Sequence, residues 1–241
     1  MYIKKLLLLI TLLGTLNATG LPKSYYKIND TKQKTTAFFN HLYPMIVLSN
    51  NKILKERAFV ESYFKNNTLK DTINSNDHAK ILKLAKKYKI KQTNNLKEYL
   101  DKINTVPPSM ALAQSAVESN WGKSRFTKQA NNIFGVWTYK GKGLVPLRRK
   151  AGEKHKIKIY NSLQGSLEGY MNLLNKGTAY KKFRRVRKAQ EQSKGELTGL
   201  ALSQTMIHYS GIGEKYLKIL RSLIRKYDLK RFDTQYYKKV S

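Results

Sequence analysis

The sequence predicts an α-rich α+β protein in which helical segments flank one short β-prone region. Apolar residues recur at helical spacing over most of the 241 residues. Between residues 133 and 160 this spacing gives way to short β-prone runs separated by glycines, and it resumes after Asn161. The glycines are Gly135, Gly141, Gly143 and Gly152. We therefore expect a helical body that carries a small β-hairpin lobe.

Residues 1–18 have the pattern of a secretory signal peptide. Lys4 and Lys5 precede an apolar run from Leu6 to Leu16, and cleavage is expected after Ala18. The run is shorter than the ~20 residues of a membrane span. We therefore expect no integral membrane span after cleavage and a location in the periplasm or cell envelope. The alternative is an uncleaved N-terminal anchor.

Residues 19–104 are predicted to form an N-terminal helical subdomain that packs on the region after it. The polar segment 19–35 is expected to be loosely ordered, and Pro44 to start or break a helix. Two more helices are expected, one capped by Asp77 and one beginning at Leu96.

Residues 105–230 form the second predicted unit, and they begin with a helix that ends at Glu118. Pro108 suits the first turn, Ser109 is able to cap it, and Gly122 suits the position after the helix end. The helix dipole and apolar neighbours both disfavour a charged carboxylate there. Glu118 is thus expected to stay protonated near neutral pH, as a general acid at a glycosidic oxygen must. The alternative interpretation is a surface glutamate.

The remaining predicted elements are helical. A helix should begin near Leu163, and the cationic run 181–188 is expected to form a solvated face or to bind anionic wall polymer. Closing helices are expected over 197–209 and 214–227, followed by a charged, frayed tail at 231–241.

The composition limits the classes of partner. The chain has 47 Lys and Arg against 15 Asp and Glu, a net charge of +32, so it should be drawn to polyanions. No nucleic-acid motif is present, and for an exported chain the anionic polymers of the envelope are the better candidates. With no cysteine, and with His155 and His208 lacking ligand-spaced partners, the sequence indicates neither a metal site nor a cofactor.

Several motifs in order make the chain similar to a known family. Residues 111–122 have the form A-x-A-Q-x-A-x-E-S-x-W-G, and residues 124–126 (S-R-F) and 131–139 (N-N-x-F-G-x-W-x-Y) follow. This order resembles the N-acetylglucosaminidases of glycoside hydrolase family 73, and most closely the Bax-type proteins of Gram-negative bacteria. The likeness covers roughly residues 105–228.

The resemblance implies a lysozyme-like fold, peptidoglycan as the substrate and Glu118 as the general acid. It also implies hydrolysis of the β-1,4 bond at N-acetylglucosamine. In the family a tyrosine near the end of the domain lines the site, and this role is assigned to Tyr209, in a segment that also contains Tyr216. We expect the chain to act as a monomer.

Six further side chains are candidates for substrate binding. Gln114 shares a helix face with Glu118. The aromatic residues are able either to stack on sugars or to pack in the core, and the core is favoured for Phe134. The asparagine is able to bind an N-acetyl group or to cap a turn. The set is Gln114, Trp121, Asn132, Phe134, Trp137 and Tyr139.

The hairpin departs from the family pattern at the second carboxylate. Relatives usually have G-x-x-H-E-V, whereas this chain has Lys156 at the acidic position, and Glu153 is the acid nearest to it. On one regular strand the two residues would face opposite sides, unless a bulge intervenes. Three options follow: Glu153 as the base, attack by the substrate's own N-acetyl group, or an inactive binder.

Three alternative functions therefore remain open at this point. A lytic transglycosylase or muramidase needs only one acid and shares the fold. A non-catalytic envelope-binding protein would fit Lys156 and the high charge. A DNA-binding protein would fit the charge but not the leader sequence.

Overall fold

The computed structural model describes residues 20–67, 75–147, 149, 152–193 and 197–240. The expected signal peptide, residues 1–18, lies outside these residues. The helices are α1 (Lys23–Tyr26), α2 (Thr31–Asn67), α3 (Ser75–Tyr88), α4 (Leu96–Lys102), α5 (Pro108–Glu118), α6 (Arg125–Ala130), α7 (Leu163–Lys176), the 3-10 helix η1 (Thr178–Tyr180), α8 (Lys181–Gln192), α9 (Gly199–Ser203), α10 (Glu214–Lys226) and α11 (Lys230–Val240). The strands are β1 (Trp137–Thr138), β2 (Gly143–Leu144) and β3 (Lys156–Lys158). The predicted α-rich α+β class with a small β lobe is confirmed.

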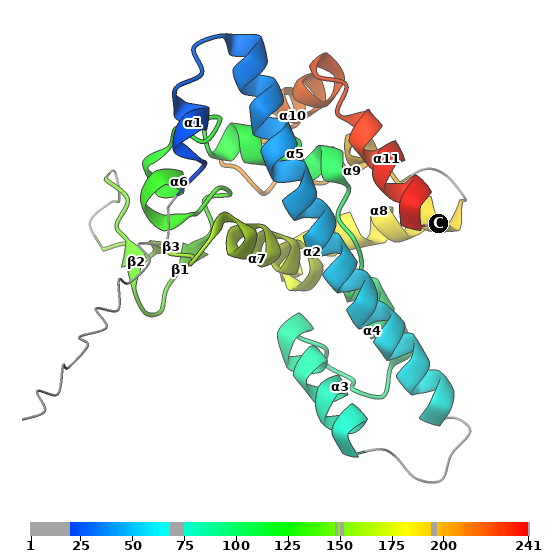
Figure 1. The fold of residues 1–241 in the computed structure, drawn as a ribbon. Helices are drawn as coiled ribbons and strands as arrows, with labels where there is room; N and C mark the ends of the chain where they lie inside the picture. Colours follow the sequence, from blue (N-terminus) through cyan, green and yellow to red (C-terminus); the bar gives the residue numbers. More distant parts are fainter. Residues whose placement is uncertain (1–19, 68–74, 148, 150–151, 194–196, 241) are drawn as a thin grey trace, which may run out of the picture.

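Helix α5 lies at the centre of the helical body. Residues 108–116 of this helix are all buried. Helices α2, α9, α10 and α11 pack around it, and Figure 1 shows α2 crossing the molecule diagonally in front of α5. A helix whose residues are almost all apolar or small is able to occupy such a position, and its one long polar side chain in the buried stretch, Gln114, forms hydrogen bonds there.

The β lobe lies beside this body, next to α6 and the start of α7 (Figure 1). Strand β3 is central and antiparallel to both neighbours, with Trp137 and Leu144 both paired to Ile157. Asn132 fixes the lobe to the body. Its side-chain amide donates to the carbonyls of Val136 and Lys158, and its oxygen accepts from the Val136 N–H.

Two predictions about the N-terminal region were wrong. The segment expected to be loose contains α1, where Leu21 and Tyr25 are buried, and the Tyr25 hydroxyl donates to the carbonyl of Trp121. Helix α2 passes through Pro44 without a break. A proline in a helix removes one backbone hydrogen bond, and buried Leu42 and Ile46 anchor α2 in the core on both sides of it.

The C-terminal tail was also predicted wrongly, because residues 230–240 form helix α11. Buried Asp233 explains its position: the carboxylate accepts from the Ser109 N–H at 2.8 Å, the Ser109 hydroxyl at 2.6 Å and the Gly199 N–H at 3.0 Å. This one side chain joins the starts of α5 and α9 to α11. Ser109 therefore binds Asp233 instead of capping its own helix.

Helix α8 differs from the predicted solvated face at two positions. Arg184 and Arg187 are 4% and 1% exposed, whereas Lys181, Lys182 and Arg185 are exposed. Because a buried guanidinium needs several acceptors, Arg187 donates to the carbonyls of Asp101, Asn104 and Thr105 and to the side chain of Asn175. It thereby ties α4 and α7 to the segment that enters α5.

Candidate active site

Glu118 is the last residue of α5, and a Schellman motif ends the helix directly after it. The Trp121 N–H donates to the Ala116 carbonyl and the Asn120 N–H to the Val117 carbonyl. The left-handed residue that this motif requires is Asn120, with φ 47°. Gly122, which the sequence suggested for the helix end, follows two residues later. Glu118 therefore lies at the negative end of the α5 dipole, as predicted.

A hydrogen-bonded chain of side chains leads to the Glu118 carboxylate. The Tyr170 hydroxyl donates to Gln114 Oε1 at 2.6 Å, and Gln114 Nε2 donates to the Tyr216 hydroxyl at 3.0 Å. The Tyr216 hydroxyl then donates to Glu118 Oε1 at 2.6 Å. Because Gln114 and Tyr170 are fully buried, this chain holds the acid from its protein side and leaves the second carboxylate oxygen, Oε2, for other contacts.

Burial raises the pKa of the Glu118 carboxyl above its ordinary value, and the hydrogen bond from Tyr216 offsets part of that rise. No Lys, Arg or His among the described residues forms an ion pair with Glu118. A nearby cation would have lowered the pKa. The environment therefore favours the protonated acid that was expected from the sequence.

Four tyrosines surround Glu118, and we call them the tyrosine cluster: Tyr170, Tyr180, Tyr209 and Tyr216. The rings of Tyr209 and Tyr216 stack in parallel with centroids 5.9 Å apart. Burial, followed by the charge of Glu118, raises the pKa of Tyr180 to about 12. The hydroxyls of the cluster therefore stay neutral near neutral pH, and those of Tyr170, Tyr209 and Tyr216 act as hydrogen-bond donors.

Gly135 brings the backbone of the β lobe up to the acid. A Cβ atom at this position would lie 3.8 Å from Glu118 Oε2, and the residue has φ +64°. The preceding carbonyl, that of Phe134, accepts from the Tyr209 hydroxyl at 3.1 Å. Glycine suits both the left-handed backbone and the close approach.

The tyrosine that donates to the acid is Tyr216, whereas the resemblance assigns the site-lining role to Tyr209. Tyr209 lies in the same cluster but donates to a backbone carbonyl. The two residues are seven positions apart, which would place them on one face of a continuous helix. A turn between α9 and α10 separates them instead, so spacing alone did not show which one reaches Glu118.

The six predicted substrate-binding residues fall into two groups. Gln114, Asn132 and Phe134 are at most 2% exposed, with their polar atoms bonded inside the protein or, for Phe134, the ring stacked on Tyr170 at 3.9 Å. Trp121 packs against Phe38, Phe39 and Tyr227. The burial of Gln114, Asn132 and Phe134 does not fit direct contact with a sugar, and these three side chains support the site instead.

Trp137 and Tyr139 form the second group and are 55% and 69% exposed. The Trp137 ring stacks on His155 with centroids 4.0 Å apart, which fixes one face and leaves the rest of the indole open. These two side chains stay candidates for stacking on sugar rings.

The position expected for a second acid is occupied by a lysine. Lys156 pairs with Thr138 in the sheet, and its Nζ donates to the Gly141 carbonyl at 3.3 Å. Glu153 precedes β3, so the alternation rule for strands does not apply to it. Its Oε2 lies 3.8 Å from Nδ1 of His155, and its side chain is 42% exposed.

Among the described residues, no group of His, Asp and Glu has the arrangement of a metal site.

Comparison with known proteins identifies the family. The family model described as "Glucosaminidase: Mannosyl-glycoprotein endo-beta-N-acetylglucosaminidase" matches residues 93–229, which is more than half of the chain. The chain belongs to this glucosaminidase family.

Two curated relatives support the assignment. The chain is 27% identical over 185 residues to Protein bax of Escherichia coli (75% of this chain, 65% of the relative). It is 28% identical over 139 residues to Exo-glucosaminidase LytG of Bacillus subtilis (53% of this chain, 46% of the relative). The chain thus spans less than two thirds of the length of either relative.

Among solved structures, the catalytic domain of the autolysin Auto from Listeria monocytogenes aligns with a TM-score of 0.48 and 19% identity, over 87% of this chain and 93% of that one. The predicted Bax-type resemblance agrees with the family match and with the two curated relatives. Within the described residues, no helix combines the length and apolar character needed to cross a membrane.

Proposed function

We propose that the chain is a peptidoglycan hydrolase of the cell envelope that cleaves the β-1,4 glycosidic bond at N-acetylglucosamine. The observation that carries the proposal is the environment of Glu118: a half-buried carboxyl with a raised pKa, held by Tyr216 at 2.6 Å and unpaired with any described cation. Such an acid is able to protonate the bridging oxygen while positive charge develops on the sugar ring. Membership of the glucosaminidase family supports the same reaction.

The hairpin favours a mechanism that relies on one protein carboxyl. With Lys156 at the usual acidic position, attack by the N-acetyl group of the substrate would replace a second carboxylate, a known exception to the two-carboxylate plan. Glu153 is the alternative base, because it is the acidic side chain nearest to this strand in the sequence. Tyr216 would then orient the acid and Tyr209 would line the sugar site. Trp137 and Tyr139 would stack on neighbouring sugars.

The partners and location follow from the same proposal. The substrate would be glycan strands in the periplasm or envelope, reached after removal of residues 1–18. The net charge of +32 would add attraction to anionic envelope polymers. We propose a monomer with a helical unit over 19–104 that supports a catalytic unit over 105–230.

Digestion of purified sacculi tests the proposal. Wild-type protein should release fragments with reducing N-acetylglucosamine ends, as measured by mass spectrometry. Glu118→Gln should release none. The control Glu168→Gln changes a glutamate on α7 that pairs with Lys52 of α2 and should behave as wild type. Loss of activity in Glu153→Gln would identify the base, and full activity would support substrate assistance.

Other end groups would contradict the proposal. Fragments with 1,6-anhydro ends would show a lytic transglycosylase. Wild-type protein that binds sacculi without cutting them would show an envelope-binding protein.

A further inference from the structure

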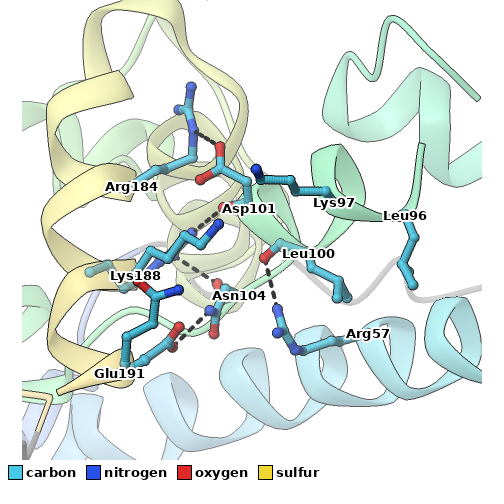
Figure 2. A pocket seen from close by; sticks show the side chains of 11 residues that line it. Arg57, Leu96, Lys97, Leu100, Asp101, Asn104, Arg184, Lys188 and Glu191 are labelled. Atoms are coloured by element: carbon cyan, nitrogen blue, oxygen red, sulfur yellow. Dashed lines mark hydrogen bonds and ion pairs between the residues drawn. The ribbon is translucent and has the colours of Figure 1, made fainter. Parts of the chain in front are cut away.

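A cavity lies among α2, α4 and α8, and none of the site residues described above lines it. Its volume is about 480 Å³, within the range of roughly 300–1,000 Å³ that small-molecule sites occupy. We call it the α4–α8 pocket. Figure 2 shows it with Leu96, Leu100 and Asp101 on α4, Arg57 on α2 and Lys188 on α8.

The internal contacts of the pocket use most of its charged groups. Arg57 donates to the carbonyls of Leu100 and Ile103, and Arg184 Nε lies 3.3 Å from the Asp101 carboxylate. Glu191 accepts from the Asn104 side-chain amide at 2.8 Å. These groups form walls that are fixed before any ligand arrives.

Two cationic side chains of the pocket take no part in these hydrogen bonds and ion pairs. Lys97 on α4 and Lys188 on α8 make no hydrogen bond or ion pair with any residue that the structure describes. In Figure 2 their ammonium groups point toward one another across the space beside Asp101. Like charges that face each other repel, so a carboxylate placed between them would remove an unfavourable interaction and gain two favourable ones.

The rest of the lining distinguishes between classes of anion. Leu96 and Leu100 offer apolar surface, which a small inorganic anion would not use. The carboxylates of Asp101 and Glu191 would repel a dense polyanion but are able to accept N–H groups. Apolar surface, free cations and N–H acceptors in one cavity suit a peptide that carries carboxylates and small aliphatic side chains.

We propose that the α4–α8 pocket binds a short acidic peptide, the stem peptide that branches from peptidoglycan strands. Such stems carry free carboxylates, amide N–H groups and alanine methyl groups. This choice of ligand rests on the proposed function, since a wall hydrolase meets stems on every strand it cuts. The pocket would make the enzyme favour stem-bearing glycan over glycan without stems.

Calorimetry with a synthetic stem tetrapeptide and the full mature chain tests the proposal. Wild type and Glu118→Gln should bind the peptide equally. The double variant Lys97→Gln/Lys188→Gln should bind roughly tenfold more weakly, since it loses two charge contacts near the protein surface. The control Lys218→Gln/Lys226→Gln removes the same charge from the exposed face of α10 and should bind as wild type. Inorganic phosphate should not compete at equal concentration.

Cleavage assays separate this proposal from the proposed function. Lys97→Gln/Lys188→Gln should raise the KM for stem-bearing glycan and leave the cleavage of stem-free glycan unchanged. Absence of peptide binding by wild type, equal weakening in the α10 control, or competition by phosphate would each overturn the pocket assignment. Peptide binding by a wild type that cuts no glycan would overturn the proposed function and leave the assignment standing.

Discussion

Replacing Tyr216 with phenylalanine removes the hydroxyl that lies 2.6 Å from Glu118 Oε1 and leaves the ring in place. This hydrogen bond favours the charged carboxylate and so lowers its pKa. Its removal must therefore raise the pKa of Glu118. A hydrogen bond contributes about 1.5–3 kcal/mol to a charged group and about 0.5–1.5 kcal/mol to a neutral one. The bond from Tyr216 therefore favours the charged form of Glu118 by roughly 1 kcal/mol, and this preference is lost in Tyr216→Phe.

The pH dependence of kcat/KM on soluble glycan fragments measures this rise. A general acid must be protonated to work, so its ionisation sets the alkaline limb of the profile. In Tyr216→Phe that limb should move to higher pH by up to about one unit. At the optimum kcat should fall about tenfold, because the acid is no longer oriented.

Tyr209→Phe is the matched control. It removes the same atom from a stacked neighbour, but that hydroxyl donates to the Phe134 carbonyl and not to the acid. Its alkaline limb should stay in place. If the alkaline limb of the Tyr216→Phe profile stays in place or moves to lower pH, the hydrogen bond from Tyr216 does not lower the pKa of Glu118.

Three further predictions concern stability and binding. Because burial raises the pKa of Glu118, the wild type should lose stability as pH rises from about 4.5 through the folded-state value. Melting temperatures of Glu118→Gln should accordingly match wild type at pH 4 and exceed it at pH 8, and a variant less stable at pH 8 would contradict this. Asp233→Ala leaves three donors without their carboxylate. It should lower the free energy of unfolding, measured in urea, by about 3–5 kcal/mol. A loss below about 1 kcal/mol would show that Asp233 does not hold α11 in place. Trp137→Ala should leave the melting temperature unchanged, because the side chain is 55% exposed, and should weaken sacculus binding roughly three- to tenfold; unchanged binding would remove Trp137 from the sugar site.

The fold class and the position of Glu118 could be predicted because local sequence determines them. The helix that ends at Glu118 depends on Pro108 at its start and on the absence of internal breakers. The glycine-rich region marks the β lobe in the same way. These signals lie within a few residues of the structure that they specify.

The long-range contacts could not be predicted. Asp233 lies 124 residues from Ser109, and Tyr216 lies 98 residues from Glu118. The charge of the C-terminal segment predicted a frayed tail, because the sequence does not show that Asp233 has buried partners. The basic run at 181–188 predicted a solvated face, because the sequence does not show the carbonyls that surround Arg187. Gln114 shares a helix face with Glu118 as expected, but that face is buried, which periodicity within one helix does not show.

The pKa of the Glu118 carboxyl in the wild-type protein tests the central claim most directly. A titration followed by carboxyl carbon NMR, with Glu118→Gln used to assign the resonance, would measure it. The account predicts a value above the ordinary 4.5. A value at or below 4.5 would mean that the carboxyl is charged at neutral pH, and Glu118 would not be the general acid.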